Sequence, residues 1–222
     1  MNETKIILGS ASPRRKELLA KLGVGFEVLT ADVDEDVVTV ADPAENVLER
    51  ARLKAAALKR IAPQEMILIT ADTTVADGVE MLNKPSNQAE AWEMLRQLRG
   101  RTHQVHSGVI IIDRNDAEHA IVNTTDVEMR QYSDNEIAAY IETGDPMDKA
   151  GAYAIQHPDF RPVARIAGCF SGVMGFPLCD VAGILVSCGV KLAIDKKLSL
   201  KERKDFYLCD RCKELFDGNS AY

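Results

Sequence analysis

The run Met66-Ile-Leu-Ile-Thr-Ala-Asp-Thr73 decides how the rest of the chain is interpreted. A short, continuous apolar stretch of this kind is typical of a strand that is buried on both faces of a sheet. The strand would deliver Asp72 to its C-terminal end, where open α/β sheets place their ligand sites. An aspartate that only caps the following loop fits this position equally well.

Segments of strand and helix character alternate on both sides of this run. Strands are predicted at 5–8 and 26–30, and two antiparallel strands at 103–113 and 120–129 are joined by a short polar turn. Apolar spacing and capping residues predict helices at 13–22, 43–59, 88–98, 134–142 and 177–188. This alternation predicts an α/β protein with a mixed, twisted central sheet flanked by helices.

The composition excludes several classes of protein. The chain of 222 residues is 27% charged and 46% hydrophobic, which is ordinary globular usage. No apolar run approaches the ~20 residues that span a bilayer, and the N-terminal segment lacks a signal-peptide layout. We therefore expect a cytoplasmic protein without a membrane partner. The net charge of -7 argues against binding nucleic acid, but not against a small anion held by local cations.

The sequence favours one domain followed by a tail. No repeat or linker interrupts residues 1–195, whereas residues 196–222 become charged and then aromatic and contain a CxxC pair, Cys209 and Cys212. A zinc site needs four ligands, and no second CxxC is present. A half-site completed by another subunit and an aromatic tail that docks on the body or on a partner both stay open. In a cytosolic chain we expect five mostly reduced cysteines: Cys169, Cys179, Cys188, Cys209 and Cys212.

The segment Gly9-Ser-Ala-Ser-Pro-Arg-Arg-Lys16 is a candidate anion site. A strand that runs through small residues into a helix start offers free backbone N–H groups and the positive end of a helix dipole. Ser12 is predicted to cap this helix. Arg14 and Arg15 add bidentate donors suited to phosphate oxygens. A surface helix with a merely solvated basic first turn is the alternative, although cations there oppose the dipole.

Further polar positions could join such a site. Lys54 lies on an alanine-rich helix and Lys84 in a loop, and each is also compatible with a solvated lysine. The pair Asp34-Glu35 fits a polar loop or a Mg²⁺ site, because hard cations take carboxylate oxygens. Gln156 ends a glycine-containing segment, where its amide could bind a base edge; a tight turn without a ligand is the alternative.

Taken in order, these segments resemble the Maf family of nucleoside triphosphate pyrophosphatases. The resemblance spans residues 5–190 and consists of many motifs in one order. The matching stretches are Ser10–Leu19, Ala51–Ala55, Ala71–Val75, Asn83–Pro85, Leu95–His103, Tyr140–Pro146, Asp148–Tyr153, Ile155–Gln156 and Gly175–Leu178.

The resemblance implies a deep cleft and a fold similar to the inosine triphosphate pyrophosphatases. It implies that Asp72 is the catalytic carboxylate and that Glu35 and Asp72 bind a divalent metal cation, Mg²⁺ or Mn²⁺. The partner would be a small-molecule nucleoside triphosphate, with a homodimer as a possible assembly. The implied triphosphate site is lined by Ser12, Arg14, Arg15, Lys54 and Lys84.

Within the family, Arg14, Thr73 and Gln156 resemble the subgroup that hydrolyses dTTP and UTP to the monophosphate plus diphosphate. Gln156 would satisfy both a donor and an acceptor of a uracil or thymine edge. Gly172 departs from the family, which usually has asparagine there. Two alternatives stay open: a 7-methyl-GTP pyrophosphatase, and a nucleotide-binding regulator of septum formation and cell division, which could dispense with Asp72.

Overall fold

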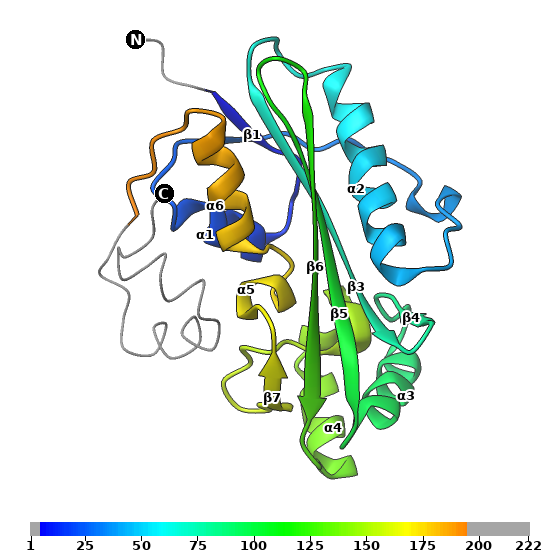
Figure 1. The fold of residues 1–222 in the computed structure, drawn as a ribbon. Helices are drawn as coiled ribbons and strands as arrows, with labels where there is room; N and C mark the ends of the chain where they lie inside the picture. Colours follow the sequence, from blue (N-terminus) through cyan, green and yellow to red (C-terminus); the bar gives the residue numbers. More distant parts are fainter. Residues whose placement is uncertain (1–4, 195–222) are drawn as a thin grey trace.

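The computed structural model describes residues 5–194 and contains a mixed sheet with helices on both faces (Figure 1). Strand β1 pairs in parallel with β2 and β3, and the other pairs are antiparallel. The predicted fold class is therefore confirmed. The order across the sheet is β2 (Glu27–Val28), β1 (Ile6–Leu8), β3 (Ile67–Asp77), β5 (Thr102–Ile112), β6 (Glu118–Met129) and β7 (Val163–Ala167), with β4 (Glu80–Leu82) paired to β3.

Six α-helices and three short 3-10 turns lie in the described part of the chain. The helices are α1 (Pro13–Ala20), α2 (Pro43–Lys59), α3 (Gln88–Leu98), α4 (Asp134–Glu142), α5 (Phe170–Val173) and α6 (Leu178–Ser187), and the 3-10 turns are η1 (Glu35–Val37), η2 (Asp145–Asp148) and η3 (Ala150–Ala152). Ser133 and Glu136 form the predicted capping box of α4. Ser12 stands at the N-cap position of α1, but its side chain makes no capping hydrogen bond, so that part of the prediction is wrong.

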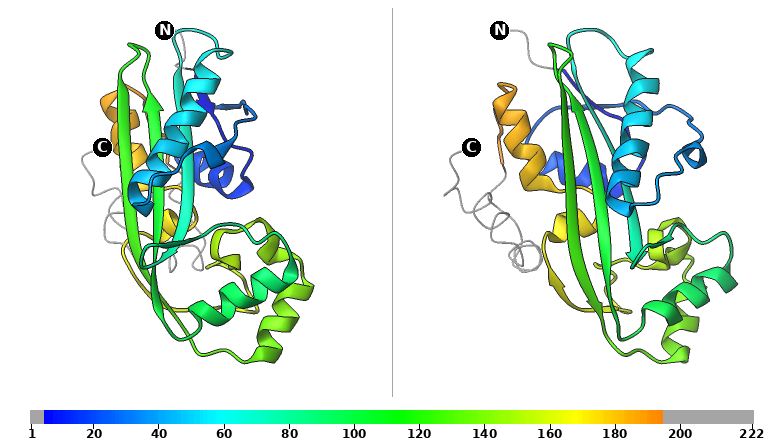
Figure 2. Two further views of the ribbon diagram at one scale, coloured as in Figure 1. Left: turned by 90° about the vertical axis from the view of Figure 1, so that its right-hand side faces the viewer. Right: turned by 45° about the vertical axis from the view of Figure 1, so that its right-hand side comes forward.

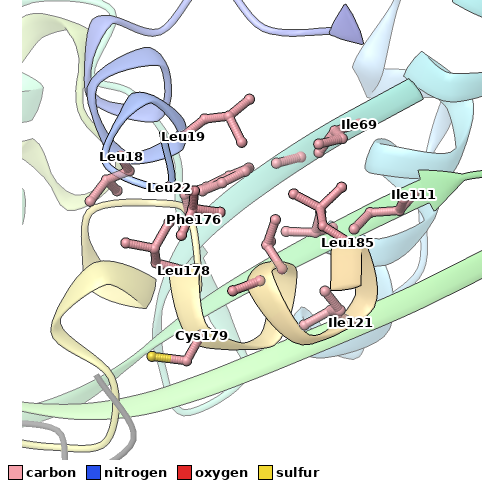
Figure 3. Close-up of a cluster of buried hydrophobic side chains, with 14 of the residues drawn as sticks. Leu18, Leu19, Leu22, Ile69, Ile111, Ile121, Phe176, Leu178, Cys179 and Leu185 are labelled. Carbon is pink, nitrogen blue, oxygen red and sulfur yellow. The ribbon is translucent and has the colours of Figure 1, made fainter. Parts of the chain in front are cut away.

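Alternating residues of β3 face two different sets of helices. Ile67, Ile69 and Ala71 belong to the core that α1 and α6 form with the sheet (Figure 3). Leu68 packs instead with Ile7 and with α2 on the other face. Successive side chains of a strand point to opposite faces, so the apolar run is buried on both sides, as predicted.

Helix α2 packs along one face of the sheet (Figure 2) and approaches it closely at Gly108. A Cβ atom at Gly108 of β5 would lie 2.7 Å from the backbone of Val47 in α2, which only a glycine avoids. The hydroxyl of Thr70 donates to the carbonyl of Ala51, 2.7 Å away, and fixes the helix along β3. This hydrogen bond holds the part of α2 around Ala51 against the middle of β3.

A second group of elements covers the other end of the long strands. Helices α3 and α4 pack around Val75, Val105 and Val127 together with the segment that contains Tyr153 (Figure 1). Among residues 5–194, no helix combines the length and apolar character that a membrane span requires. The predicted tail, residues 196–222 with Cys209 and Cys212, lies outside the described residues.

Strand β3 is longer than the sequence predicted. Asp72 was expected at its C-terminal end, but the strand continues to Asp77, and Asp72 lies opposite Gly108 in β5. The reason is that β5 goes on pairing with β3 after β1 has stopped at Leu8, the partner of Ile69. Asp72 therefore lies beyond the end of β1, where β3 has no parallel neighbour.

Candidate active site

A cleft of about 840 Å³ opens beyond the end of β1. Its walls come from the loop after β1, the first turn of α1, helix α2, the middle of β3 and the turns at 148–156. All the predicted site residues line this one cleft: Ser12, Arg14, Arg15, Glu35, Lys54, Asp72, Thr73, Lys84 and Gln156. The structure thus brings together residues that are far apart in the sequence.

Asp72 faces helix α2 and meets Lys54. Its carboxylate oxygen Oδ1 lies 2.6 Å from the Lys54 ammonium, and both side chains are largely buried, with 12% and 15% exposed. The alternation of β3 explains the contact, because Asp72 is on the same face as Thr70, which holds Ala51 of α2. Lys54 is one helical turn after Ala51 and so reaches Asp72, two residues further along the strand.

Glu35 contacts the same ammonium group from the loop that precedes α2. Its Oε1 atom lies 3.0 Å from Lys54 Nζ, so one cation is shared by two carboxylates. Within residues 5–194, the second oxygen of Asp72, Oδ2, accepts no hydrogen bond. Two converging carboxylates with an available oxygen are ligands that suit Mg²⁺ or Mn²⁺, whose coordination phosphate oxygens and water would complete.

Arg15 lies on the other side of β3 and is bound to protein atoms. Its Nε donates to the carbonyl of Gly175 at 2.9 Å, and Nη1 donates to Ser10 Oγ and to the carbonyl of Ala71. Nη2 donates to Thr73 Oγ1 at 3.1 Å. Four of the five guanidinium N–H groups are therefore used within the protein. Arg15 lines the cleft, as the resemblance implied, but it mainly joins the walls together.

Burial lowers the pKa of Arg15 from its ordinary value, and the nearby Asp72 carboxylate opposes this shift. The guanidinium of an arginine is not deprotonated in proteins. Arg15 therefore contributes a fixed positive charge to the wall of the cleft. That charge faces Asp72 from the side opposite Lys54.

A chain of hydroxyl groups continues from Arg15 into the sheet. Thr73 Oγ1 lies 2.9 Å from Ser107 Oγ, and Ser107 donates to the carbonyl of Gly172 at 2.8 Å. Because Ser107 uses its proton on Gly172 and Arg15 can only donate, Thr73 must donate to Ser107 and accept from Arg15. The direction of every hydrogen bond in the chain is thus fixed, and the hydroxyl of Thr73 is locked in place.

Gly172, the departure from the family pattern, fits this arrangement. A Cβ atom there would lie 2.3 Å from the amide oxygen of Asn123, so a larger side chain would collide with it. The backbone carbonyl of Gly172 takes part in the hydroxyl chain, and no side chain is needed. The substitution is therefore compatible with an intact cleft.

Two cations of the cleft are left without a protein partner. In the part of the chain that the structure describes, neither Arg14 nor Lys84 has a carboxylate within 4.0 Å. Arg14 is in the first turn of α1, and Lys84 is exposed in the loop after β4. Gln156 is also exposed, at the edge of the cleft. Unpaired cations in a concave site favour an anionic ligand.

The sequence interpretation missed two basic residues of the cleft. Arg50 lies one turn before Lys54 on α2, with Nη1 4.0 Å from Glu35 Oε2, and its i, i+4 spacing from Lys54 is a signal that could have found it. Lys149 is buried and bonded to Asp145 and Asp148, which neutralise it. No pattern in the sequence distinguishes this lysine from a free one.

Fold and site together define an α/β protein whose cation-lined cleft is suited to a small polyanion next to a carboxylate. The family model described as "Maf-like protein" matches residues 5–188. The chain belongs to the Maf family.

Several relatives carry the name "dTTP/UTP pyrophosphatase". The one from Methylobacillus flagellatus is 42% identical over 193 residues, which is 86% of this chain and 96% of the relative. The one from Myxococcus xanthus is 43% identical over 192 residues, covering 86% and 96%. The one from Thermococcus kodakarensis is 42% identical over 173 residues, covering 78% and 91%.

The matches among solved structures are more distant. A HAM1 protein from Coxiella burnetii has a TM-score of 0.45 at 16% identity, covering 83% of this chain and 99% of that one. The Ham1 protein of Staphylococcus aureus has a TM-score of 0.45 at 13% identity, covering 98% and 100%.

Proposed function

We propose that this protein is a nucleoside triphosphate pyrophosphatase that hydrolyses dTTP and UTP to the monophosphate plus diphosphate. The observation that carries the proposal is the position of Asp72 in a cleft that also presents the unpaired cations Arg14 and Lys84. Membership of the Maf family and relatives named for this activity, 42–43% identical, support it.

Asp72 is the group we assign to the reaction. Its oxygen Oδ1 is held by Lys54, and Oδ2 is available to orient or deprotonate the water that attacks the α-phosphorus. The bond between the α-phosphorus and the bridging oxygen breaks, and diphosphate leaves. Arg14 and Lys84 are placed to bind the phosphate groups that leave as diphosphate, both before and after the bond breaks.

A divalent cation, Mg²⁺ or Mn²⁺, would be held by Glu35 and Asp72 and, when bound, would neutralise charge on the phosphate oxygens. The two carboxylates already converge on the Lys54 ammonium, at 2.6 and 3.0 Å. They therefore lie close enough to share a cation. Lys54 offsets one of their two negative charges and would line the triphosphate site beside them.

We assign selection of the base to Gln156 and Thr73. The amide of Gln156 makes no hydrogen bond within residues 5–194 and can pair with both a donor and an acceptor of uracil or thymine. The locked hydroxyl of Thr73 gives the cleft a fixed polar contact rather than an adjustable one. Ser12, in the loop before α1, lines the phosphate end next to Arg14.

The alternatives are weaker. The names of the relatives do not favour a 7-methyl-GTP pyrophosphatase. A regulator of septum formation that only binds nucleotides would have no use for a carboxylate held in the cleft by Lys54. Neither alternative explains the complete set of predicted residues, Arg14, Thr73 and Gln156 included, as well as hydrolysis of dTTP and UTP does.

A substrate panel with released diphosphate as the readout tests the proposal. We expect kcat/KM for dTTP and UTP to exceed that for 7-methyl-GTP by at least about tenfold, or about 1.4 kcal/mol. Other nucleoside triphosphates serve as controls in the same assay. A preference for 7-methyl-GTP, or binding of dTTP without diphosphate release, would contradict the proposal.

A further inference from the structure

A cluster of three possible metal ligands lies outside the cleft. It consists of Asp113 at the end of β5, His119 in β6 and Cys188 at the end of α6, and one ligand atom of each lies within 4.8 Å of the others. These segments meet at the end of the β5–β6 hairpin, beside the end of α6 (Figure 1). None of the three residues lines the nucleotide cleft.

The backbone holds the cluster in position. Asp113 Oδ1 accepts hydrogen bonds from the amides of Asn115 and Ala117, at 2.8 and 3.0 Å, within the hairpin turn. Its other oxygen, Oδ2, faces His119 Nε2 at 3.3 Å. Arg114 Nη2 donates to the carbonyl of Cys188 at 3.3 Å and so joins the turn to the end of α6. These bonds hold the turn that contains Asp113 against the end of α6, where Cys188 lies.

Two of the three distances between the ligand atoms match a tetrahedral metal site, and the third is within 4.8 Å. His119 Nε2 lies 3.3 Å from the Asp113 carboxylate and 3.8 Å from Cys188 Sγ. Ligands bound to tetrahedral zinc at about 2.0–2.3 Å are about 3.3–3.8 Å from one another. One nitrogen therefore faces both other ligands at the distances that a shared ion requires.

The chemistry of the three ligands selects the metal. A thiolate, an imidazole and a carboxylate are the three ligand types that proteins use for Zn²⁺, whereas Mg²⁺ takes oxygen ligands. The cluster is also accessible to an ion, since the His119 side chain is 32% exposed and that of Asp113 is 14% exposed. With the thiol and the carboxyl ionised, the three ligands balance the charge of one divalent cation.

We propose that Asp113, His119 and Cys188 form a zinc site that joins the β5–β6 hairpin to α6 and is independent of nucleotide hydrolysis. The fourth ligand would be water. When bound, zinc would stabilise the fold by cross-linking these two elements. A plain ion pair between Asp113 and His119 that only closes the hairpin is the opposing interpretation.

Metal titration of the chelator-treated full-length protein tests this proposal. We expect about one zinc ion per chain and, with Co²⁺ instead, a thiolate-to-cobalt charge-transfer absorption in the near ultraviolet. Cys188→Ser and His119→Gln should each weaken zinc binding at least about tenfold, and Cys188→Ser should also abolish the absorption. Both variants should retain dTTP hydrolysis, which shows that they fold.

Three controls separate this site from others in the same chain. Asp116→Asn changes a carboxylate of the same turn that pairs with Lys59 instead, and should leave zinc binding unchanged. Asp72→Asn removes a carboxylate of the cleft and should also bind zinc as the wild type does. The double variant Cys209→Ser/Cys212→Ser removes both thiols of the predicted tail and shows whether zinc binding depends on them.

Unchanged zinc affinity in both Cys188→Ser and His119→Gln would overturn the proposal. If the tail variant loses zinc binding in that case, the metal belongs to the tail alone. Loss of zinc binding in Cys188→Ser and His119→Gln supports the proposal, whatever the tail variant does.

Discussion

The inner wall of the cleft and its rim use charge in opposite ways. On the inner wall, which we define as Arg15, Glu35, Lys54, Asp72 and Thr73, each side chain is already bonded to another protein group. On the rim, defined as Arg14, Lys84 and Gln156, the side chains face the cleft and have no ion pair among residues 5–194. The wall is thus preorganised, whereas the rim acquires its partners only when a ligand binds.

This difference predicts two kinds of mutational effect. Groups held in place before the ligand arrives contribute most to the transition state, because they need no rearrangement during the reaction. Groups that contact remote parts of the ligand contribute to binding in the ground state and the transition state alike. Changes on the wall should therefore lower kcat or stability, and changes on the rim should raise KM.

The largest effect is expected at Asp72. Asp72→Asn keeps the shape of the side chain and can still accept a hydrogen bond from Lys54, but it removes the charge. We expect kcat for dTTP to fall at least about 1000-fold, or about 4 kcal/mol, with a much smaller change in KM. Diphosphate release at saturating dTTP measures this, and an unchanged melting temperature serves as the control. Turnover within tenfold of the wild type would refute the role of Asp72.

Among the residues of the inner wall, Arg15 should contribute most to the free energy of unfolding of the protein. Arg15→Lys keeps a positive charge but cannot bond Gly175, Ala71 and Thr73 at once. We expect a loss of about 2–4 kcal/mol in the free energy of unfolding, measured by denaturant titration. Arg14→Lys is the matched control, expected to change stability by less than about 0.5 kcal/mol. Equal effects at the two arginines would remove the distinction between wall and rim.

The pH dependence of stability tests the buried contact between His103 and Tyr153, a third part of the cleft beside the inner wall and the rim. His103 is 3% exposed, its Nε2 lies 2.8 Å from the hydroxyl of Tyr153, which lines the cleft, and burial lowers the pKa of His103 to about 4. Below pH 6.5 the unfolded chain protonates this histidine, while the folded chain does so only near pH 4.

Stability should therefore fall as the pH drops from 6.5 to 4, by up to about 3 kcal/mol from His103. Denaturant titration at several pH values measures the slope, and His103→Gln should remove this part of it. An identical slope in wild type and variant would show that His103 is not held neutral by the fold.

The smallest effects are expected on the rim. Arg14→Ala and Lys84→Ala should each raise KM for dTTP by about tenfold, or about 1.4 kcal/mol, with less than a threefold change in kcat. Lys59→Ala, which removes an exposed lysine paired with Asp116 away from the cleft, is the control. Steady-state kinetics separate the two parameters. A fall in kcat as large as the rise in KM would place these cations with the inner wall.

The sequence predicted the fold class, the bounds of α2, α3 and α4, and the residues that meet in one cleft. It placed Asp72 at a strand end, because a polar residue after an apolar run usually marks the end of a strand. The pairing of β3 with β5 past the end of β1 is a tertiary effect that local pattern does not contain. The sequence also predicted that Ser12 caps α1. Ser12 occupies the N-cap position, but its side chain makes no hydrogen bond to the helix.

The sequence does not predict which of two neighbouring residues of the same type is bonded within the protein and which faces the cleft. Arg14 and Arg15 look equivalent in the sequence, yet one faces the cleft freely and the other is bonded to three different segments of the protein. A rotation of about 100° per helical residue separates them. The cluster of Asp113, His119 and Cys188 has no motif spacing, since Cys188 joins it only through the packing of α6.

Hydrolysis of dTTP in ¹⁸O-labelled water tests the account most directly, because it shows which phosphorus the water attacks. Attack at the α-phosphorus, beside Asp72, places the label in dTMP and leaves the released diphosphate unlabelled. Mass spectrometry of the two products distinguishes the outcomes. Label in the diphosphate, or release of orthophosphate with dTDP, would contradict the assignment of Asp72 and of the cleft that holds it.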